Sequence, residues 1–142
     1  MTQTHVDPTR AQFEAFKALD RSAPVQMLNL VRFRDQAAYP EGHANAGLTG
    51  AEAYAEYGKR SGPIFARVGG EIVWRGSFET ILIGPQDERW DACFVAAYPT
   101  AHAFLEMVTD PDYQRAVVHR QAAVQTSRLL RCGPSAEGMT FG

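Results

Sequence analysis

The segment Val25–Phe33, with the sequence VQMLNLVRF, constrains the fold most because it is apolar at nearly every position. A strand with one wet face alternates apolar and polar residues, whereas a strand covered on both faces does not. No apolar run in the chain, this one included, is long enough to span a bilayer as a helix. The segment therefore predicts a strand that is covered on both faces.

Cap and turn signals divide the rest of the chain into elements. Asp7-Pro8 and Asp110-Pro111 each place a helix N-cap residue before a proline, which suits the first helical turn. Gly69-Gly70 suits a helix C-cap with positive φ, and a kink is expected near Ser61-Gly62-Pro63. The pattern predicts helices over 8–20, 51–68 and, in two segments, 100–123, and strands over 25–33, 71–83, 90–98 and 124–132.

The second predicted strand, over residues 71–83, is long and alternating. Ile72, Trp74, Phe78 and Leu82 share one of its faces, and Gly76 is expected to mark a bulge. A polar hairpin loop over 84–89 then leads into the third strand.

The predicted order is one helix followed by β-α-β-β-α-β, which is the split βαβ order of a ferredoxin-like fold. The fold class is therefore α+β, with an antiparallel sheet and an extra N-terminal helix. Helices can cover one face of such a sheet, yet the first three strands carry large apolar residues on both faces. A second copy of the sheet is the simplest cover for the other face, so we expect a homodimer, a dimeric α+β barrel.

A chain of 142 residues fits one domain over 1–142. Its core is expected over about 24–132, with a loose C-terminal tail over 133–142. Residues 34–50 contain Pro, Gly, Asn and Ala without periodicity. So long a loop inside a domain is either disordered or functional, for example as a flap over a pocket.

Charge and cysteine content narrow the partners and the compartment. Fourteen basic and sixteen acidic residues give a net charge of -2 without a basic patch, so neither nucleic acid nor a membrane is expected as a partner. The N-terminus lacks the basic and apolar regions of a signal peptide. Cys93 and Cys132 lie far apart and form no C-x-x-C motif, so we expect a cytoplasmic protein without a disulfide framework.

A series of short motifs runs in order between Val25 and Leu130. It comprises MLNLVRF at 27–33, YAEYG at 54–58, GG at 69–70 before Trp74, IGP at 83–85, WD at 90–91, YP at 98–99, Phe104 with Met107, DPDY at 110–113, HR at 119–120 with AA at 122–123, and SRL at 127–129. As a set, these motifs resemble domain of unknown function family 1330.

The resemblance implies the dimeric α+β barrel superfamily. That superfamily includes cofactor-less monooxygenases, muconolactone isomerase-like enzymes, haem-dependent enzymes and plain ligand-binding domains. It implies no particular activity for this family. The N-terminal helix and the loop over 34–50 are longer here than a minimal member needs.

His119 and Asn29 are the candidate catalytic residues. Imidazole titrates near neutrality, so His119 suits acid–base work; the alternative is a helix-end histidine that interacts with the helix dipole or with solvent. Asn29 shares a strand face with Met27, Val31 and Phe33, where a polar group must be hydrogen-bonded. It either orients a ligand or makes a structural hydrogen bond to a loop.

The candidate ligand-binding residues are Tyr54, Tyr57, Trp74, Tyr98 and Arg120. Tyr54 and Tyr57 are neighbours on one helix, where they either line a pocket with their hydroxyls or pack in the core. Trp74 is a pocket wall or a core residue, and Arg120 is a possible anion anchor. The pocket is expected between the sheet and the helices, beneath the loop over 34–50, with apolar walls from Met27, Trp74, Phe94 and Tyr98.

Two functions from different classes fit these residues. The first is an enzyme that oxygenates or isomerises an apolar or aromatic acid without a cofactor, which is what the resemblance implies. The second is a non-catalytic homodimeric domain that binds a small metabolite or has a structural role. No metal or cofactor is expected, because His5, His43, His102 and His119 show no metal-ligand spacing and nothing supports a haem ligand.

Overall fold

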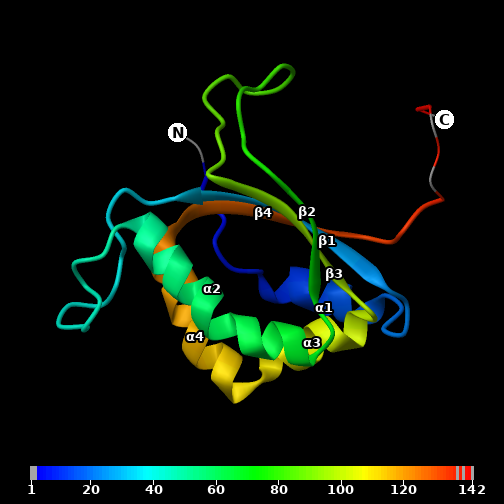
Figure 1. The fold of residues 1–142 in the computed structure, drawn as a ribbon, viewed down its shortest axis with the longest axis horizontal. Helices are drawn as coiled ribbons and strands as arrows, with labels where there is room; N and C mark the ends of the chain where they lie inside the picture. Colours follow the sequence, from blue (N-terminus) through cyan, green and yellow to red (C-terminus); the bar gives the residue numbers. More distant parts are fainter. Residues whose placement is uncertain (1–2, 137, 139, 142) are drawn as a thin grey trace.

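A computed structural model of the chain describes residues 3–136, 138 and 140–141. Within these residues the chain forms a four-stranded antiparallel sheet and four helices (Figure 1). The elements are α1 (Arg10–Ala18), β1 (Val25–Phe33), α2 (Gly50–Arg67), β2 (Glu71–Gly76), β3 (Ala92–Tyr98), α3 (Ala101–Thr109), α4 (Pro111–Ala123) and β4 (Val124–Cys132). The sheet order β2-β3-β1-β4 confirms the predicted ferredoxin-like topology.

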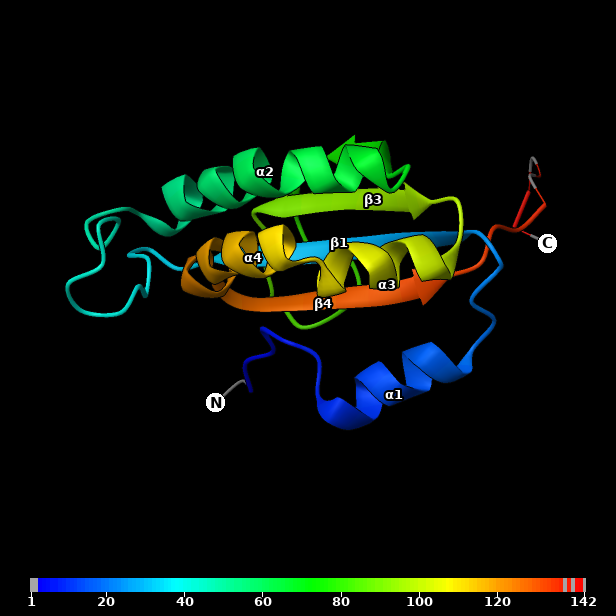
Figure 2. The same cartoon turned by 90° about the horizontal axis from the view of Figure 1, so that it is seen from below.

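The sheet has an inner face that the helices cover and an outer face that they leave open. Figure 2 shows α2, α3 and α4 on the same side of the strands, with α1 beside the β4 edge. On β1, the inner face carries Val25, Met27 and Val31, which are all buried. α1 is attached to the edge by Phe16, whose ring centroid lies 5.0 Å from that of Phe104.

The predicted stop at Gly69-Gly70 is confirmed in detail. Gly69 has a φ of +89°, and its N–H donates to the Ala66 carbonyl over 3.0 Å. The Gly70 N–H reaches back to the Phe65 carbonyl over 2.8 Å. This pair of bonds closes the last turn of α2 in the way that favours glycine after a helix.

Two helix starts show how caps set element boundaries. Asp110 caps α4 with Pro111 at its first position, as predicted. For α1 the prediction of residues 8–20 was too long, and the cap is Thr9 rather than Asp7. Thr9 and Gln12 form a reciprocal capping box, which satisfies more backbone groups than the Asp7-Pro8 pair would.

The second and third strands are shorter than predicted. β2 ends at Gly76 instead of residue 83, and β3 begins at Ala92 instead of Trp90. Asp91 instead ties the chain to β1, because its carboxylate accepts the Phe33 N–H over 2.8 Å. Residues 77–91 therefore leave the sheet as an arm, which rises on the side opposite the helices (Figure 1).

A bulge in β2 reverses the predicted alternation. Ile72 pairs with Ala96, but Trp74 pairs with Val95, so Val73 is an extra residue opposite β3. The bulge was predicted at Gly76, but the register shift falls at Val73. Beyond it Trp74 faces outward and Arg75 faces inward, so the prediction that Ile72 and Trp74 share one face was wrong.

The loop over 34–49 is ordered and attached to the end of α4. The Ala38 N–H donates to the Ala122 carbonyl over 2.8 Å, and the Arg34 N–H donates to the Ala123 carbonyl over the same distance. Gln36 forms an isolated bridge with Thr49, which caps α2. Of the two alternatives predicted for this loop, disorder is thus excluded.

The inner face carries two separate core clusters. The first is built around Met27, Tyr98 and Met107 beneath α3. The second is built around Val31 and Val124 at the other end of the sheet. Phe94 is partly buried and packs against both clusters, so the space between them lies around the middle of β3. The predicted loose tail begins as expected with no helix or strand over 133–136; residues 137, 139 and 142 lie outside the described part.

Candidate functional site

A row of side chains crosses the inner face of the sheet between the two core clusters. Arg75 of β2 pairs with Phe94 of β3, which pairs with Asn29 of β1. None of the three is fully buried, although helices cover this face. Because this face is covered and these residues are still accessible, the helices and the sheet do not pack tightly together here. We call these three residues the inner row.

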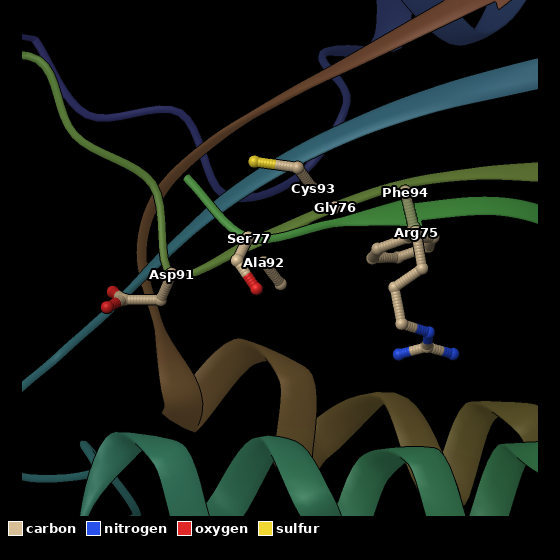
Figure 3. A pocket seen from close by; sticks show the side chains of 7 residues that line it. All are labelled: Arg75, Gly76, Ser77, Asp91, Ala92, Cys93 and Phe94. Carbon is tan, nitrogen blue, oxygen red and sulfur yellow. The ribbon is translucent and has the colours of Figure 1, made fainter. Parts of the chain in front are cut away.

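A half-open cavity of about 290 Å³ lies at one end of the inner row. Arg75 and Phe94 line it together with Gly76, Ser77, Asp91, Ala92 and Cys93. Figure 3 shows the side chains of Arg75, Ser77 and Phe94 turned toward the helices, and that of Cys93 turned away. The cavity therefore lies where β2 ends and β3 begins, and it presents a guanidinium, a hydroxyl and an aromatic ring on the side that faces the helices.

Asn29 lies at the far end of the inner row, on the same face of β1 as Met27 and Val31, as the sequence predicted. Its side-chain Nδ2 donates to the Met27 carbonyl over 3.0 Å. The amide oxygen accepts no hydrogen bond within the part of the chain that the structure describes. Of the two alternatives predicted for Asn29, the bond to a loop is thus not formed among the described residues, and the side chain bonds locally instead.

Tyr54 and Tyr57 of α2 lie side by side, as their spacing predicts, with ring centroids 5.4 Å apart. Tyr57 shares a hydrogen bond of 2.8 Å with the hydroxyl of Tyr113, whereas Tyr54 makes no side-chain hydrogen bond among the described residues. Burial raises the pKa of Tyr54 well above its usual range, while Arg120 and Arg75 act in the opposite direction. The Tyr54 phenol thus stays protonated at neutral pH, and it contributes to the lining of neither cavity described here.

His119 occupies a different environment from Asn29. Its Nδ1 lies 2.6 Å from the hydroxyl of Tyr39 in the loop over 34–49. The ring of His43 stacks on Tyr39 with centroids 4.6 Å apart and lies 6.2 Å from the ring of His119. Burial lowers the pKa of His119, and the nearby Arg60 lowers it further. The imidazole is therefore neutral at physiological pH and belongs to a contact between the loop and α4.

The structure places Trp74, Tyr98 and Arg120 outside both cavities. Trp74 lies on the outer face and is 52% exposed, because the bulge turns it away from the helices. Tyr98 is buried in the first core cluster. Arg120 donates to the Val6 carbonyl over 2.6 Å and to the Ser127 hydroxyl over 3.2 Å, so it anchors the N-terminal segment. Of the predicted pocket walls, Phe94 lines the cavity.

A second cavity of about 340 Å³ lies near the start of α2. It is lined by Phe33, Arg34, Asp35, Thr49, Ala51, Arg89 and Asp91. Asp91 borders both cavities, but its carboxylate is held by the Phe33 N–H. The remaining charged side chains in this lining are Arg34, Asp35 and Arg89, and none of the inner row contributes to it.

Arg75 and Ser77 are the residues that the sequence did not single out. A strict period of two places Arg75 on the outer face, and the bulge moves it to the inner one. The usable signal was a charged residue inside an otherwise aromatic and apolar strand segment. In the described residues no group of three or more His, Cys, Asp or Glu side chains could hold a metal ion.

Comparison with known proteins identifies the class of this chain. The family model described as Domain of unknown function (DUF1330) matches residues 43–131. The crystal structure of a protein of unknown function from Rhodopseudomonas palustris is 56% identical, with a TM-score of 0.89 over 95% of this chain and 100% of that one. The methylated form of that protein gives 55% identity and a TM-score of 0.91 over 97% and 100% of the two chains.

The protein is thus a ferredoxin-like α+β domain. It belongs to the DUF1330 family, as its sequence motifs indicated. SnoaB, a cofactor-independent oxygenase from Streptomyces nogalater, is 15% identical with a TM-score of 0.47, over 84% of this chain and 99% of that one. Likeness at that level says nothing about activity. No functionally curated protein matches the chain, and no described helix has the length and apolar character needed to cross a membrane.

Proposed function

We propose that this protein binds a small organic molecule in the cavity beside the inner row. The observation that carries the proposal is the incomplete burial of Arg75, Phe94 and Asn29 on a sheet face that helices cover. Binding sites are typically apolar hollows with a few polar groups that fix the orientation of the ligand. Phe94 supplies the apolar surface here, and Arg75 and Ser77 supply polar groups.

Binding without catalysis is the better supported of the two functions. An acid–base catalyst must reach the reacting atoms, and His119 contributes to the lining of neither cavity. Its Nδ1 is already engaged by Tyr39. Asp91 lines both cavities, but its carboxylate is engaged by the Phe33 N–H. Tyr54 lines neither cavity, and the upward shift of its pKa makes it a donor rather than a base at neutral pH. Oxygenase-like or isomerase-like chemistry therefore lacks a positioned base.

A thermal-shift screen of small metabolites tests the binding function, because a ligand of the folded state raises the unfolding temperature. Hits are then titrated calorimetrically against Ser77→Ala and Phe94→Ala, which alter the cavity lining. Tyr39→Phe is the control, since it removes a hydroxyl from the loop instead of the cavity.

We expect both cavity variants to weaken the binding of a hit, while Tyr39→Phe leaves it unchanged. A hit that binds all four proteins equally would place the ligand elsewhere. The failure of every metabolite to raise the unfolding temperature would count against the binding function itself.

The homodimer is also part of this proposal, and its support is the outer face of the sheet. Trp74 pairs with Val95, which pairs with Leu28, which pairs with Leu130, so an apolar row crosses all four strands. Trp74 is 52% exposed and Leu130 is 45% exposed. A continuous apolar surface of this kind marks an interaction site, and a second copy with the same row is self-complementary about a two-fold axis.

The arm over 77–91 supplies a second argument for a copy of this chain as the partner. It rises on the same side as the outer face (Figure 1), and Leu82 and Ile83 in it are 90% and 94% exposed. The arm also carries Glu79, Asp87 and Glu88, while the outer face carries Arg32 and Arg128. In the described residues, Arg32 Nε is a buried donor without an acceptor. The arm and the face are therefore complementary in both apolar character and charge.

Sedimentation velocity tests the dimer with Leu130→Glu in the outer row. Burying an unpaired charge in an interface is costly, so we expect the wild-type protein to sediment as a dimer and the variant as a monomer. Leu19→Glu is the control, because Leu19 is an equally exposed leucine at the end of α1. A wild-type protein that is monomeric at micromolar concentration would overturn the dimer.

A cytoplasmic location is the remaining proposal, and it rests on cysteine chemistry. Cys93 is buried, Cys132 is exposed, and both are free thiols. Exposed free thiols are typical of reducing compartments. Fractionation of the source cells, followed by detection of the native protein, checks the location; recovery from a secreted fraction would contradict it.

A further inference from the structure

We propose that the ligand of the cavity is a small carboxylate with a flat apolar body, held by Arg75 and Phe94. This inference rests on the binding function proposed above and names the ligand class for the same site.

Arg75 is a cation without a counter-ion. None of the ion pairs among the described residues includes it. Its guanidinium lies over the ring of Phe94, with 5.9 Å between the guanidinium carbon and the ring centroid. The bulge at Val73 directs it to the inner face, where Figure 3 shows it extending toward the helices. A positive charge placed there attracts an anionic group into the cavity.

The acidic residue nearest to the site does not neutralise Arg75. Asp91 borders the cavity, but its carboxylate accepts the Phe33 N–H over 2.8 Å. In Figure 3 that carboxylate points away from the guanidinium. The positive charge of Arg75 and the negative charge of Asp91 therefore stand apart in the lining, and the Arg75 end of the cavity is its positive end.

The polar groups around Arg75 are donors. Ser77 presents a hydroxyl beside it in the lining. A guanidinium offers two parallel N–H groups that match the two oxygens of a carboxylate. A guanidinium beside a hydroxyl therefore favours an acceptor-only anion over a neutral amide or alcohol.

The size and the apolar wall restrict the rest of the ligand. A volume of about 290 Å³ lies at the lower end of the range for small-molecule sites. Phe94 is the aromatic surface within it, and it packs against both core clusters, which fixes its position. Flat apolar groups stack favourably on such a ring. A carboxylate attached directly to a ring or to a conjugated chain satisfies both requirements.

Nuclear magnetic resonance with benzoate, benzamide and phenyl phosphate as probes tests this assignment on the full chain. Benzoate at millimolar concentration is expected to shift the Arg75 Nε–H and Phe94 ring signals, and to bind at least ~10-fold more tightly than benzamide, because charged hydrogen bonds are the stronger ones. Arg75→Gln is expected to remove that preference. Arg10→Gln, at the exposed start of α1, should leave it intact.

Each other outcome overturns the carboxylate class. Equal binding of benzoate and benzamide would remove the role of charge, and tighter binding of phenyl phosphate would assign the site to phosphate esters. If benzoate moves neither signal while a neutral metabolite gives a thermal shift that Phe94→Ala abolishes, the cavity binds ligands but not this class. If no compound binds at all, the proposed function fails as well.

Discussion

The Tyr39 hydroxyl and the Nδ1 atom of His119 lie 2.6 Å apart, although the two residues are eighty positions apart in the chain. This contact joins the loop over 34–49 to α4 at a buried imidazole. The groups that face the ring from neighbouring elements are Arg60 and Glu56 of α2 and His43 of the loop. Stability should therefore depend on the charge of His119.

Folding lowers the pKa of His119 below its ordinary value, chiefly by burial. The unfolded chain then binds the proton more readily than the folded chain does. The stability that the neutral ring contributes is fully present above the unfolded pKa near 6.5 and is lost as the pH falls through the lower, folded pKa.

We expect the midpoint of urea unfolding to decrease between about pH 7.5 and about pH 5 in the wild-type protein. His119→Asn keeps a polar group near the Nδ1 position but cannot titrate, so its midpoint should change less over the same interval. His102→Asn, at an exposed position of α3, is the control and should behave like the wild type. Identical pH profiles for the wild-type protein and His119→Asn would refute the linkage.

Loss of the Tyr39 hydroxyl should loosen the loop while the sheet stays intact. Tyr39→Phe leaves His119 Nδ1 without its partner, at an expected cost of about 1 kcal/mol. Hydrogen exchange should then accelerate at the Ala38 amide, which bonds to Ala122. The Leu28 amide, in the middle of β1, serves as the internal reference. Unchanged protection at Ala38 would mean that the backbone bonds alone hold the loop.

Two glycines of the same helix should respond in opposite ways to alanine. A Cβ atom at Gly50 would lie 2.0 Å from the Arg34 carbonyl oxygen, whereas one at Gly58 would meet nothing within 4 Å. Gly50→Ala forces the start of α2 away from the loop, so we expect a loss of at least about 2 kcal/mol. Gly58→Ala should stabilise the protein by about 0.5–1 kcal/mol.

Urea denaturation of the two glycine variants measures both effects. Because both substitutions add the same methyl group to one helix, helix propensity cancels from the comparison. If Gly50→Ala proved as stable as Gly58→Ala, the close approach of Arg34 to α2 would be disproved.

Much of the fold could be predicted because local signals agreed with tertiary structure. The bounds of Val25–Phe33 and Val124–Cys132 are confirmed to the residue, since apolar runs between turn residues mark strands that pair along their length. Gly69 and Asp110 were equally informative, because a cap is satisfied by its own neighbours.

The second strand failed as a prediction because alternation does not ensure a partner. Phe78 and Leu82 continue the period of two, but the pairing of β2 with β3 ends at Gly76 and Cys93. The chain there becomes the arm, and Leu82 is left 90% exposed. Pairing is a tertiary event that the sequence of one strand does not encode.

The candidate site was predicted in part for a similar reason. Asn29 and Tyr54 were found because polar residues on apolar faces need an explanation. His119 was assigned to the same pocket as Asn29, yet its partners come from the loop over 34–49, which has no periodicity from which contacts could be inferred. Arg75 was missed because a bulge has no reliable local signature.

The extra residue at Val73 has a consequence for how relatives of this protein should be aligned. With Val73, an aromatic residue points outward and an arginine points inward; a homologue one residue shorter at this place reaches the same arrangement by plain alternation. A one-residue gap opposite Val73 therefore leaves the residues that line the cavity unchanged. An ungapped alignment of two such sequences would instead equate Trp74 with an inward residue of the homologue. Residues of the outer face would then be aligned with residues of the inner face.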